Sequence, residues 1–246
     1  MSTLTEQLIK KLTSSNELAN IMDSSTSLYN FNSLRDLELI DDLKTTIISE
    51  NNKYLKYAPL YTKAKIISYG MNGKYEISHV HYLKDGLNIE INRNKLPFIR
   101  LDLNLYSTYH LNQILGIFLL LFYNGYSKYE LKANLAKINF KDYEKKDYLI
   151  KIKYHSYYDL KEILLHLYSY DKHPIIILNS HKNGEKYAKL VSLFADKAFL
   201  VGDINSLDGL NKGYISDSFY LTYDIKIALK NASNLTKSKI YILTDS

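Results

Sequence analysis

The chain has 246 residues, 46% of them hydrophobic and 24% charged, a composition typical of a soluble globular protein with one or two buried cores. Its net charge of +6 comes almost wholly from lysine, since arginine occurs only at Arg35, Arg93 and Arg100. Arginine makes the bidentate contacts to phosphate and guanine, so its scarcity argues against nucleic-acid binding. The absence of cysteine excludes disulfides, thiolate catalysis and sulfur-ligated metals.

The sequence also lacks the usual signals for a membrane or for secretion. Its longest apolar run, residues 114–123, is shorter than the ~20 residues that a membrane span needs. Residues 1–4 do not open a signal peptide, because no basic segment precedes an apolar core. We therefore expect a cytoplasmic protein. The 24 tyrosines, together with many lysines, asparagines and isoleucines, indicate an AT-rich genome, which we take to be bacterial.

The first 44 residues are predicted to form a helical segment. An amphipathic helix is expected over residues 3–12, with its apolar side formed by Leu4, Leu8, Ile9 and Leu12. A second helix is expected over residues 33–43, with Ser33 as its N-cap. An amphipathic helix can lie in the groove of a partner protein. The apolar side of the first helix is therefore a candidate docking surface.

Residues 45–139 are predicted to combine a small sheet with an apolar helix. Strands are expected over residues 45–49 and 64–70, and a hairpin is expected around Asp85-Gly86, a strong turn signal. After a strand at residues 96–101, residues 105–125 are long enough for a buried helix that ends at Asn124-Gly125. A further helix over residues 127–137 begins with Ser127 and Glu130 in capping-box spacing.

The pattern changes after residues 140–148, which are charged and aperiodic and are predicted to be a linker. From residue 149 to residue 246, strand-like and helix-like segments alternate in a βαβαβ series. Such alternation predicts a mostly parallel sheet with helices on both faces. The fold class is therefore α/β, with two domains.

Four local matches in this order resemble the Mur ligases, the ATP-dependent amide-forming family of peptidoglycan synthesis. IISENN (47–52) resembles the strand and acidic turn N-A-D-D, and ISYGMNGKYEISHVHYLKDGLNIEI (67–91) resembles the strand and hairpin that open with Y-G. YHLNQILGIFLLLFYNG (109–125) resembles the helix that starts H-N-x-x-N. IKYHSYYDLKEILLHL (152–167) resembles the strand and helix that open with D-Y-A-H-x-P-D. The resemblance implies a truncated Mur ligase-like central domain followed by a Rossmann-like C-terminal domain.

The family's functional positions are largely altered. A Mur ligase holds ATP on a P-loop, G-x-x-G-K-[ST]. The nearest match here, GMNGKY (70–75), lacks the serine or threonine hydroxyl that follows the lysine in the motif. The acidic pair is replaced by Asn51-Asn52, and residues 24–42 contain no lysine to match the family's magnesium-bridging lysine. The vestiges of the family's polar motifs are Asn112, Tyr154 and Asp159. Without a phosphate cradle or a metal bridge, phosphoryl transfer lacks charge stabilisation.

The resemblance therefore implies the fold, and the departures argue against the activity. We predict a non-catalytic pseudoenzyme without cofactor, metal or ATP, which binds one or more proteins or takes part in an assembly. The helix of residues 3–12 lies outside the matched region and is the candidate docking element. An alternative is the acceptor-domain subunit of a split amide ligase, whose P-loop is on another chain.

Three other groups of residues each have a functional interpretation and a structural one. His79 and His81 share one face of a predicted strand and could begin a metal site, but exposed or hydrogen-bonded sheet histidines are favoured. Lysines and aromatics alternate over residues 137–154, where a solvated linker is favoured over a nucleic-acid surface. Asp203 and Asp208 follow a predicted strand, where either a residual small-molecule pocket or an ordinary turn can form.

Overall fold

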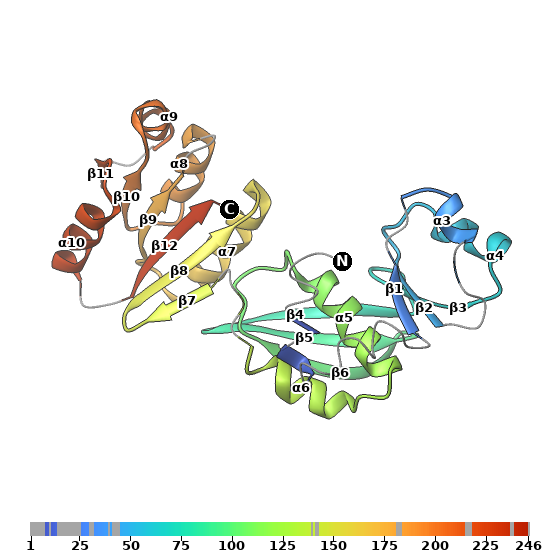
Figure 1. Ribbon diagram of the computed structural model, residues 1–246. Coiled ribbons are helices and arrows are strands. Elements are labelled where there is room, and N and C mark those ends of the chain that lie inside the picture. The colour runs from blue at the N-terminus through green and yellow to red at the C-terminus, as the bar shows by residue number, and fades with distance from the viewer. Residues whose placement is uncertain are drawn as a thin grey trace. The chain divides into compact units, whose positions relative to one another are not determined.

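The computed structural model describes residues 8–9, 11–13, 26–29, 32–38, 40, 45–138, 140, 143–180, 184–214, 218–236 and 239–245. The chain divides into two units. The first consists of Met1–Asn104 with His110–Ile138, and the second of Leu105–Tyr109 with Asn139–Ser246. The described part of each unit contains one six-stranded sheet (Figure 1).

The sheet of the first unit has the order β1-β2-β3-β4-β5-β6. Its strands β1 (Thr26–Tyr29), β2 (Thr45–Ser49) and β3 (Lys65–Tyr69) are parallel, and β4 (Tyr75–Leu83), β5 (Gly86–Arg93) and β6 (Leu96–Leu103) form an antiparallel meander. The hairpin predicted at Asp85-Gly86 is confirmed as the β4–β5 connection. The expectation that residues 1–44 are helical is wrong for β1, which pairs with β2.

Several helical elements of the first unit are short. The 3₁₀ turn η1 (Leu55–Tyr57) leads into α4 (Ala58–Tyr61), and α3 (Arg35–Glu38) is a single turn. At α3 the Ser33 hydroxyl donates to Asp36 instead of capping the helix. The helix α6 (Lys128–Leu135) has no hydrogen bond from the Ser127 side chain, so the predicted capping box is not formed.

The apolar helix α5 (Leu111–Tyr123) packs on the parallel strands β1, β2 and β3 and ends before Gly125, as predicted. It begins six residues later than the predicted residue 105. Residues 105–109 belong to the second unit, where their backbone and side chains make hydrogen bonds with the helix α7 (Tyr157–Tyr170). These tertiary contacts compete with helical hydrogen bonds over the same residues.

Three apolar residues of the candidate docking helix are buried in the first unit. Leu8, Ile9 and Leu12 are 2%, 0% and 4% exposed, and the Asn134 side chain of α6 donates to the Leu12 carbonyl. The predicted apolar stripe therefore exists at these three positions, but it packs inside the first unit. These three side chains are therefore not exposed in this structure, and a docking role for the segment stays a prediction. Leu4 lies outside the described residues.

The second unit has the strand order β11-β10-β9-β12-β8-β7. Its strands β8 (Leu149–Tyr154), β9 (Ile175–Asn179), β10 (Lys197–Val201), β11 (Phe219–Thr222) and β12 (Ile240–Asp245) are parallel, as predicted. Part of the predicted linker, residues 140–148, is instead the antiparallel edge strand β7 (Tyr143–Lys146), which pairs with β8. The charged, aperiodic character of this segment is typical of an exposed edge strand as well as of a linker.

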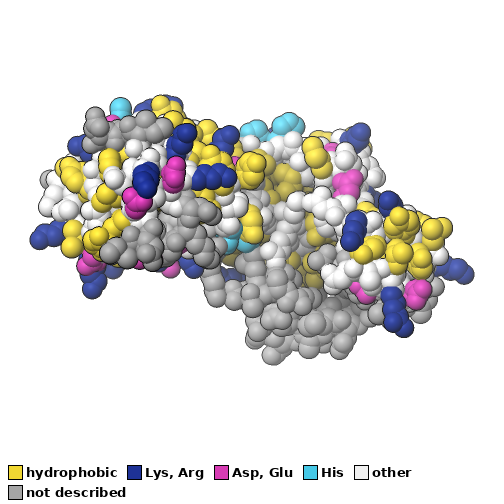
Figure 2. All heavy atoms as spheres, turned by 90° about the horizontal axis from the view of Figure 1, so that it is seen from above, with side chains coloured by type: hydrophobic (Ala, Val, Ile, Leu, Met, Phe, Trp, Pro, Cys, Tyr) yellow, Lys and Arg dark blue, Asp and Glu magenta, His cyan; other side chains and the backbone are white. Residues whose placement is uncertain are grey.

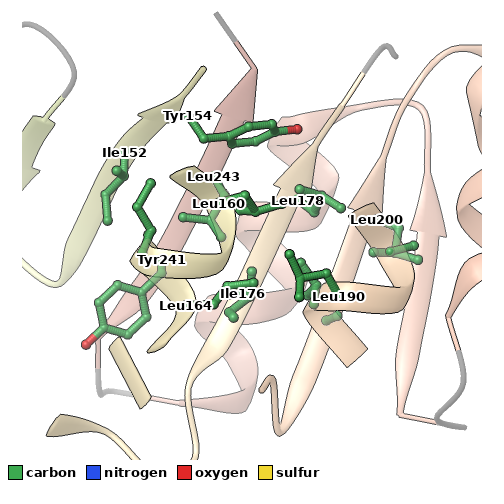
Figure 3. Packing of buried hydrophobic residues seen from close by; sticks show 14 of the residues in the cluster. Ile152, Tyr154, Leu160, Leu164, Ile176, Leu178, Leu190, Leu200, Tyr241 and Leu243 are labelled. Carbon is green, nitrogen blue, oxygen red and sulfur yellow. The ribbon is translucent and has the colours of Figure 1, made fainter. Parts of the chain in front are cut away.

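Helices cover both faces of this second sheet, as the βαβ pattern predicts. The helices α7 (Tyr157–Tyr170), α8 (Gly184–Ser192) and α9 (Ile204–Gly213) contribute to the larger core, part of which Figure 3 shows. The helix α10 (Ile225–Leu235) packs its Ala228 and Ala232 on the opposite face. Among the described helices, none is long and apolar enough to cross a membrane.

Candidate functional site

The segment nearest to a P-loop in sequence is a tight turn between β3 and β4. The Gly70 amide donates to the Tyr75 carbonyl at 2.9 Å, and the Gly73 amide donates to the Gly70 carbonyl at 3.3 Å. The Lys74 amide donates to the Ser68 hydroxyl at 2.9 Å. A P-loop needs backbone amides that point at phosphate oxygens. In this turn these three amides are already bonded within the protein.

A carboxylate also occupies this turn. The Asn72 amide donates to the side chain of Glu50, the residue that follows β2. A Cβ on Gly70 would lie 3.2 Å from the Glu50 Cβ, so the two segments are in close contact. The carboxylate takes the amide that a phosphate would require, and it would repel a phosphate at the same position. We infer that the turn serves to join β2, β3 and β4.

The position of the family's acidic pair is likewise used locally. The Asn52 side chain accepts the Tyr54 amide at 3.0 Å, and the Asn52 amide donates to the Ser49 carbonyl at 3.0 Å. Asparagine commonly forms such a turn by bonding to the backbone two residues ahead. Asn52 therefore shapes the loop that leads from β2 into η1.

One of the three vestigial positions, Asp159, lies in the first turn of α7. The Ser156 hydroxyl accepts the Asp159 amide at 3.1 Å, and the Asp159 carboxylate accepts the His155 amide at 2.7 Å. This reciprocal arrangement satisfies backbone donors at a helix N-terminus, as a capping box does. Asp159 is 4% exposed. Its observed role is to hold the first turn of the helix.

Burial also raises the pKa of the Asp159 carboxyl, which interactions with the Ser107 side chain and the His155 amide lower only in part. The folded protein therefore binds this proton more tightly than the unfolded chain does, and the carboxyl adds stability as the pH falls. We expect the melting temperature of the wild type to rise, relative to that of Asp159→Asn, as the pH is lowered from 7 towards the ordinary value of 3.8.

This prediction is checked by melting both proteins at a series of pH values and one ionic strength, so that general charge effects are shared. A melting-temperature difference between the two proteins that does not change with pH would contradict the proposed cause.

Residues 105–109 contact α7 near Asp159 through hydrogen bonds and ring stacking. Glu162 accepts both the Thr108 amide at 3.1 Å and the Thr108 hydroxyl at 2.6 Å. The Tyr109 ring stacks on His155 with 4.4 Å between ring centroids, and the Tyr106 ring stacks on His166 at 4.8 Å. These polar and aromatic groups anchor the chain segment that joins β6 to α5.

The other two retained positions have different surroundings. Tyr154, at the end of β8, is 1% exposed and lies in the larger core of the second unit (Figure 3). Its ring is edge-on to that of Tyr187. Burial raises the pKa of its hydroxyl. Asn112 is exposed in the first turn of α5 and belongs to the first unit.

The aspartates after β10 have separate structural roles. The Asp203 carboxylate accepts the Ser206 amide at 2.8 Å at the start of α9, and Asp208 forms an ion pair with Lys212 at 2.6 Å. A nearby hollow of about 500 Å³ is lined by Gly184, Glu185, Lys186, Lys189 and Gly209. The position of this hollow does not follow from local sequence patterns, because residues of two separate helices, α8 and α9, line it. The glycines on the two helices are the signal that could have indicated it.

The two strand histidines are confirmed as exposed side chains on one face of β4. Glu90 of β5 lies between them, 3.4 Å from His79 and 3.6 Å from His81, and it also pairs with Arg100 at 2.5 Å. The side chains of His79 and His81 are 65% and 55% exposed. In the part of the chain that the structure describes, no group of three or more His, Cys, Asp or Glu residues is arranged to hold a metal ion.

Comparison with solved structures decides the fold. MurF from Acinetobacter baumannii has a TM-score of 0.60 at 13% identity over 87% of this chain and 51% of its own. MurC from Thermotoga maritima has a TM-score of 0.58 at 12% identity over 100% of this chain and 69% of its own. The fold is that of the Mur ligases.

Mycobacterium tuberculosis folylpolyglutamate synthase, solved with ADP and AMPPCP, shares this Mur ligase-like fold, with a TM-score of 0.60 at 8% identity over 92% of this chain and 62% of its own. The chain spans about half the length of the MurF structure that it matches. No protein-family model matches the sequence, and no curated protein sequence is significantly similar to it. The resemblance noted in the sequence is thus confirmed at the level of the fold.

Proposed function

We propose that this chain is a non-catalytic Mur ligase-like protein that acts as a protein-binding or assembly component. The observation that carries the proposal is the β3–β4 turn, where Glu50 and neighbouring backbone groups take up the amides of the one P-loop-like segment. The capping role of Asp159 and the buried position of Tyr154 support it as well. Both residues have structural reasons to be retained that do not depend on catalysis.

This proposal predicts that Mg-ATP leaves the melting temperature unchanged. A ligand at a hundred times its Kd stabilises a folded protein by about 2.7 kcal/mol, which shifts the melting temperature by several degrees. The measurement is a thermal-shift titration of the full chain with Mg-ATP, with magnesium alone as the control. A saturable shift of several degrees that Gly73→Ala removes would overturn the proposal, since that substitution alters the turn directly.

The alternative is that the chain supplies the acceptor domain of an amide ligase whose P-loop lies on another chain. Among the described strands of the first unit, β1 pairs with β2 alone, and the edge of a parallel sheet can accept a further strand. Purification under mild conditions with mass spectrometry separates the two functions. A stoichiometric partner with a G-K-[ST] motif supports the split ligase, and an assembly of proteins without one supports the first proposal.

A further inference from the structure

The short helix α4 presents an exposed apolar and basic surface on the first unit. We call the α4 surface the group formed by Lys53, Lys56, Tyr57, Leu60, Tyr61 and Lys63. Leu60 is 79% exposed, Tyr61 is 40% exposed and Tyr57 is 37% exposed. The three lysines are exposed as well. Figure 2 shows hydrophobic side chains gathered at the end of this unit that α3 and α4 form, with basic and acidic side chains around them.

The burial of α4 explains why these side chains face outward. Ala58 is fully buried and packs in a small core with Leu37, Ile48 and Ala64. Because successive residues of a helix turn by about 100°, Leu60 lies on the side opposite to Ala58 and faces outward. Tyr61 lies closer to the side of Ala58 and is less exposed than Leu60. The packing of Ala58 therefore fixes the orientation of Leu60, even though the helix is only one turn long.

The charge around this surface has a single sign in the sequence. Residues 51–75 contain five lysines and neither aspartate nor glutamate. Lys53 and Lys56 lie over the rings of Tyr54 and Tyr57, each with its Nζ 4.9 Å from the ring centroid. Their stems thus extend over aromatic side chains, which leaves the ammonium groups beside the apolar ones. The surface is complementary to a partner that is both negatively charged and apolar.

The amino-acid composition of the α4 surface distinguishes between a protein partner and a membrane partner. Lysine is depleted in protein–protein interfaces, where arginine is enriched. Exposed leucine and tyrosine beside lysines are instead typical of proteins that lie on anionic membranes, since the apolar side chains enter the headgroup region and the lysines attract the phosphates. We propose that the α4 surface binds the surface of an anionic lipid bilayer. This inference is independent of the proposed function.

The absence of tryptophan from the chain allows a direct test. Tyr61→Trp introduces a single tryptophan on the α4 surface, and its emission is expected to shift to shorter wavelength on vesicles of phosphatidylcholine mixed with phosphatidylglycerol. Vesicles of phosphatidylcholine alone are expected to give no shift. The matched control is Tyr223→Trp, at a position 69% exposed in the second unit, which should not respond to either vesicle. No shift for Tyr61→Trp, or an equal shift on both vesicle types, would overturn the proposal.

Flotation of the full chain with the mixed vesicles separates the contribution of the apolar side chain to binding from the contribution of the lysine charges. Leu60→Ser is expected to weaken binding about tenfold, because it removes an apolar side chain from the bilayer, whereas Leu96→Ser, at a position 70% exposed, leaves binding unchanged. Lys53→Glu with Lys56→Glu is expected to weaken it by a similar factor, and Lys226→Glu is the control. If the lysine substitutions weaken binding and Leu60→Ser does not, the surface recognises polyanions such as nucleic acid, and the lipid proposal is wrong.

Discussion

Gly213→Ala is expected to lower the free energy of unfolding of the second unit by about 3 kcal/mol, at the upper end of the usual cost of overpacking. Gly213 ends α9, where α9 packs against α8. A Cβ at this position would lie 2.0 Å from the Glu185 carbonyl oxygen and 2.6 Å from its carbonyl carbon. Because these are backbone atoms of another helix, a side-chain rotation cannot relieve the clash. The two helices must move apart.

The matched control is Gly209→Ala on the same helix. There the nearest atom to a Cβ is the Glu185 amide nitrogen at 3.3 Å, and alanine is favoured over glycine in a helix by about 1 kcal/mol. We therefore expect only a small change in stability. Urea denaturation gives the two free energies, and hydrogen exchange in α8 and α9 locates the change. Equal effects of the two substitutions would show that the close approach of the helices does not limit stability.

Ile9→Ala is expected to lower the free energy of unfolding of the first unit by about 3 kcal/mol, the usual cost of truncating a buried aliphatic side chain. Ile9 is fully buried, and the Thr13 hydroxyl donates to its carbonyl at 2.8 Å. The control is Ile227→Ala on α10. Its side chain is 51% exposed, so the change should stay within about 0.5 kcal/mol. Denaturant unfolding of both variants is the measurement.

This comparison also decides how an effect of the N-terminal segment on partner binding should be interpreted. If Ile9→Ala destabilises the protein as expected, loss of a partner on deletion of residues 8–12 reflects damage to the first unit. If Ile9→Ala leaves stability unchanged but abolishes capture of a partner, residues 8–12 act as a docking element, as the sequence first indicated. A double measurement of stability and capture is therefore needed for any variant in this segment.

The retained Asp159 has a structural role at the start of α7. At a helix N-terminus, a carboxylate stabilises the backbone amides and interacts favourably with the helix dipole. Substitution at Asp159 would also disturb the neighbourhood of Thr108 and Glu162, which fasten residues 105–109 to α7. Selection for stability alone is therefore enough to keep this aspartate in a Mur ligase-like fold. Its presence is not evidence for catalysis.

The sequence by itself determined most of the secondary structure. The β4–β5 hairpin follows from Asp85-Gly86, the end of α5 follows from Asn124-Gly125, and the parallel sheet of the second unit follows from alternating strand and helix periods. These features depend on residues close together in the chain, so local turn chemistry and hydrophobic periodicity are enough to predict them.

The tertiary structure decided the features that depend on residues far apart. Leu8 and Ile9 have the same apolar pattern whether they are exposed or buried, and only packing within the first unit determines which. Residues 105–109 could continue α5, but Glu162 and His166 hold them on α7. The amides of the β3–β4 turn could face a phosphate, but Glu50, 22 residues before Asn72, accepts one of them. A sequence pattern specifies which groups can bond, and the folded chain specifies which partners reach them.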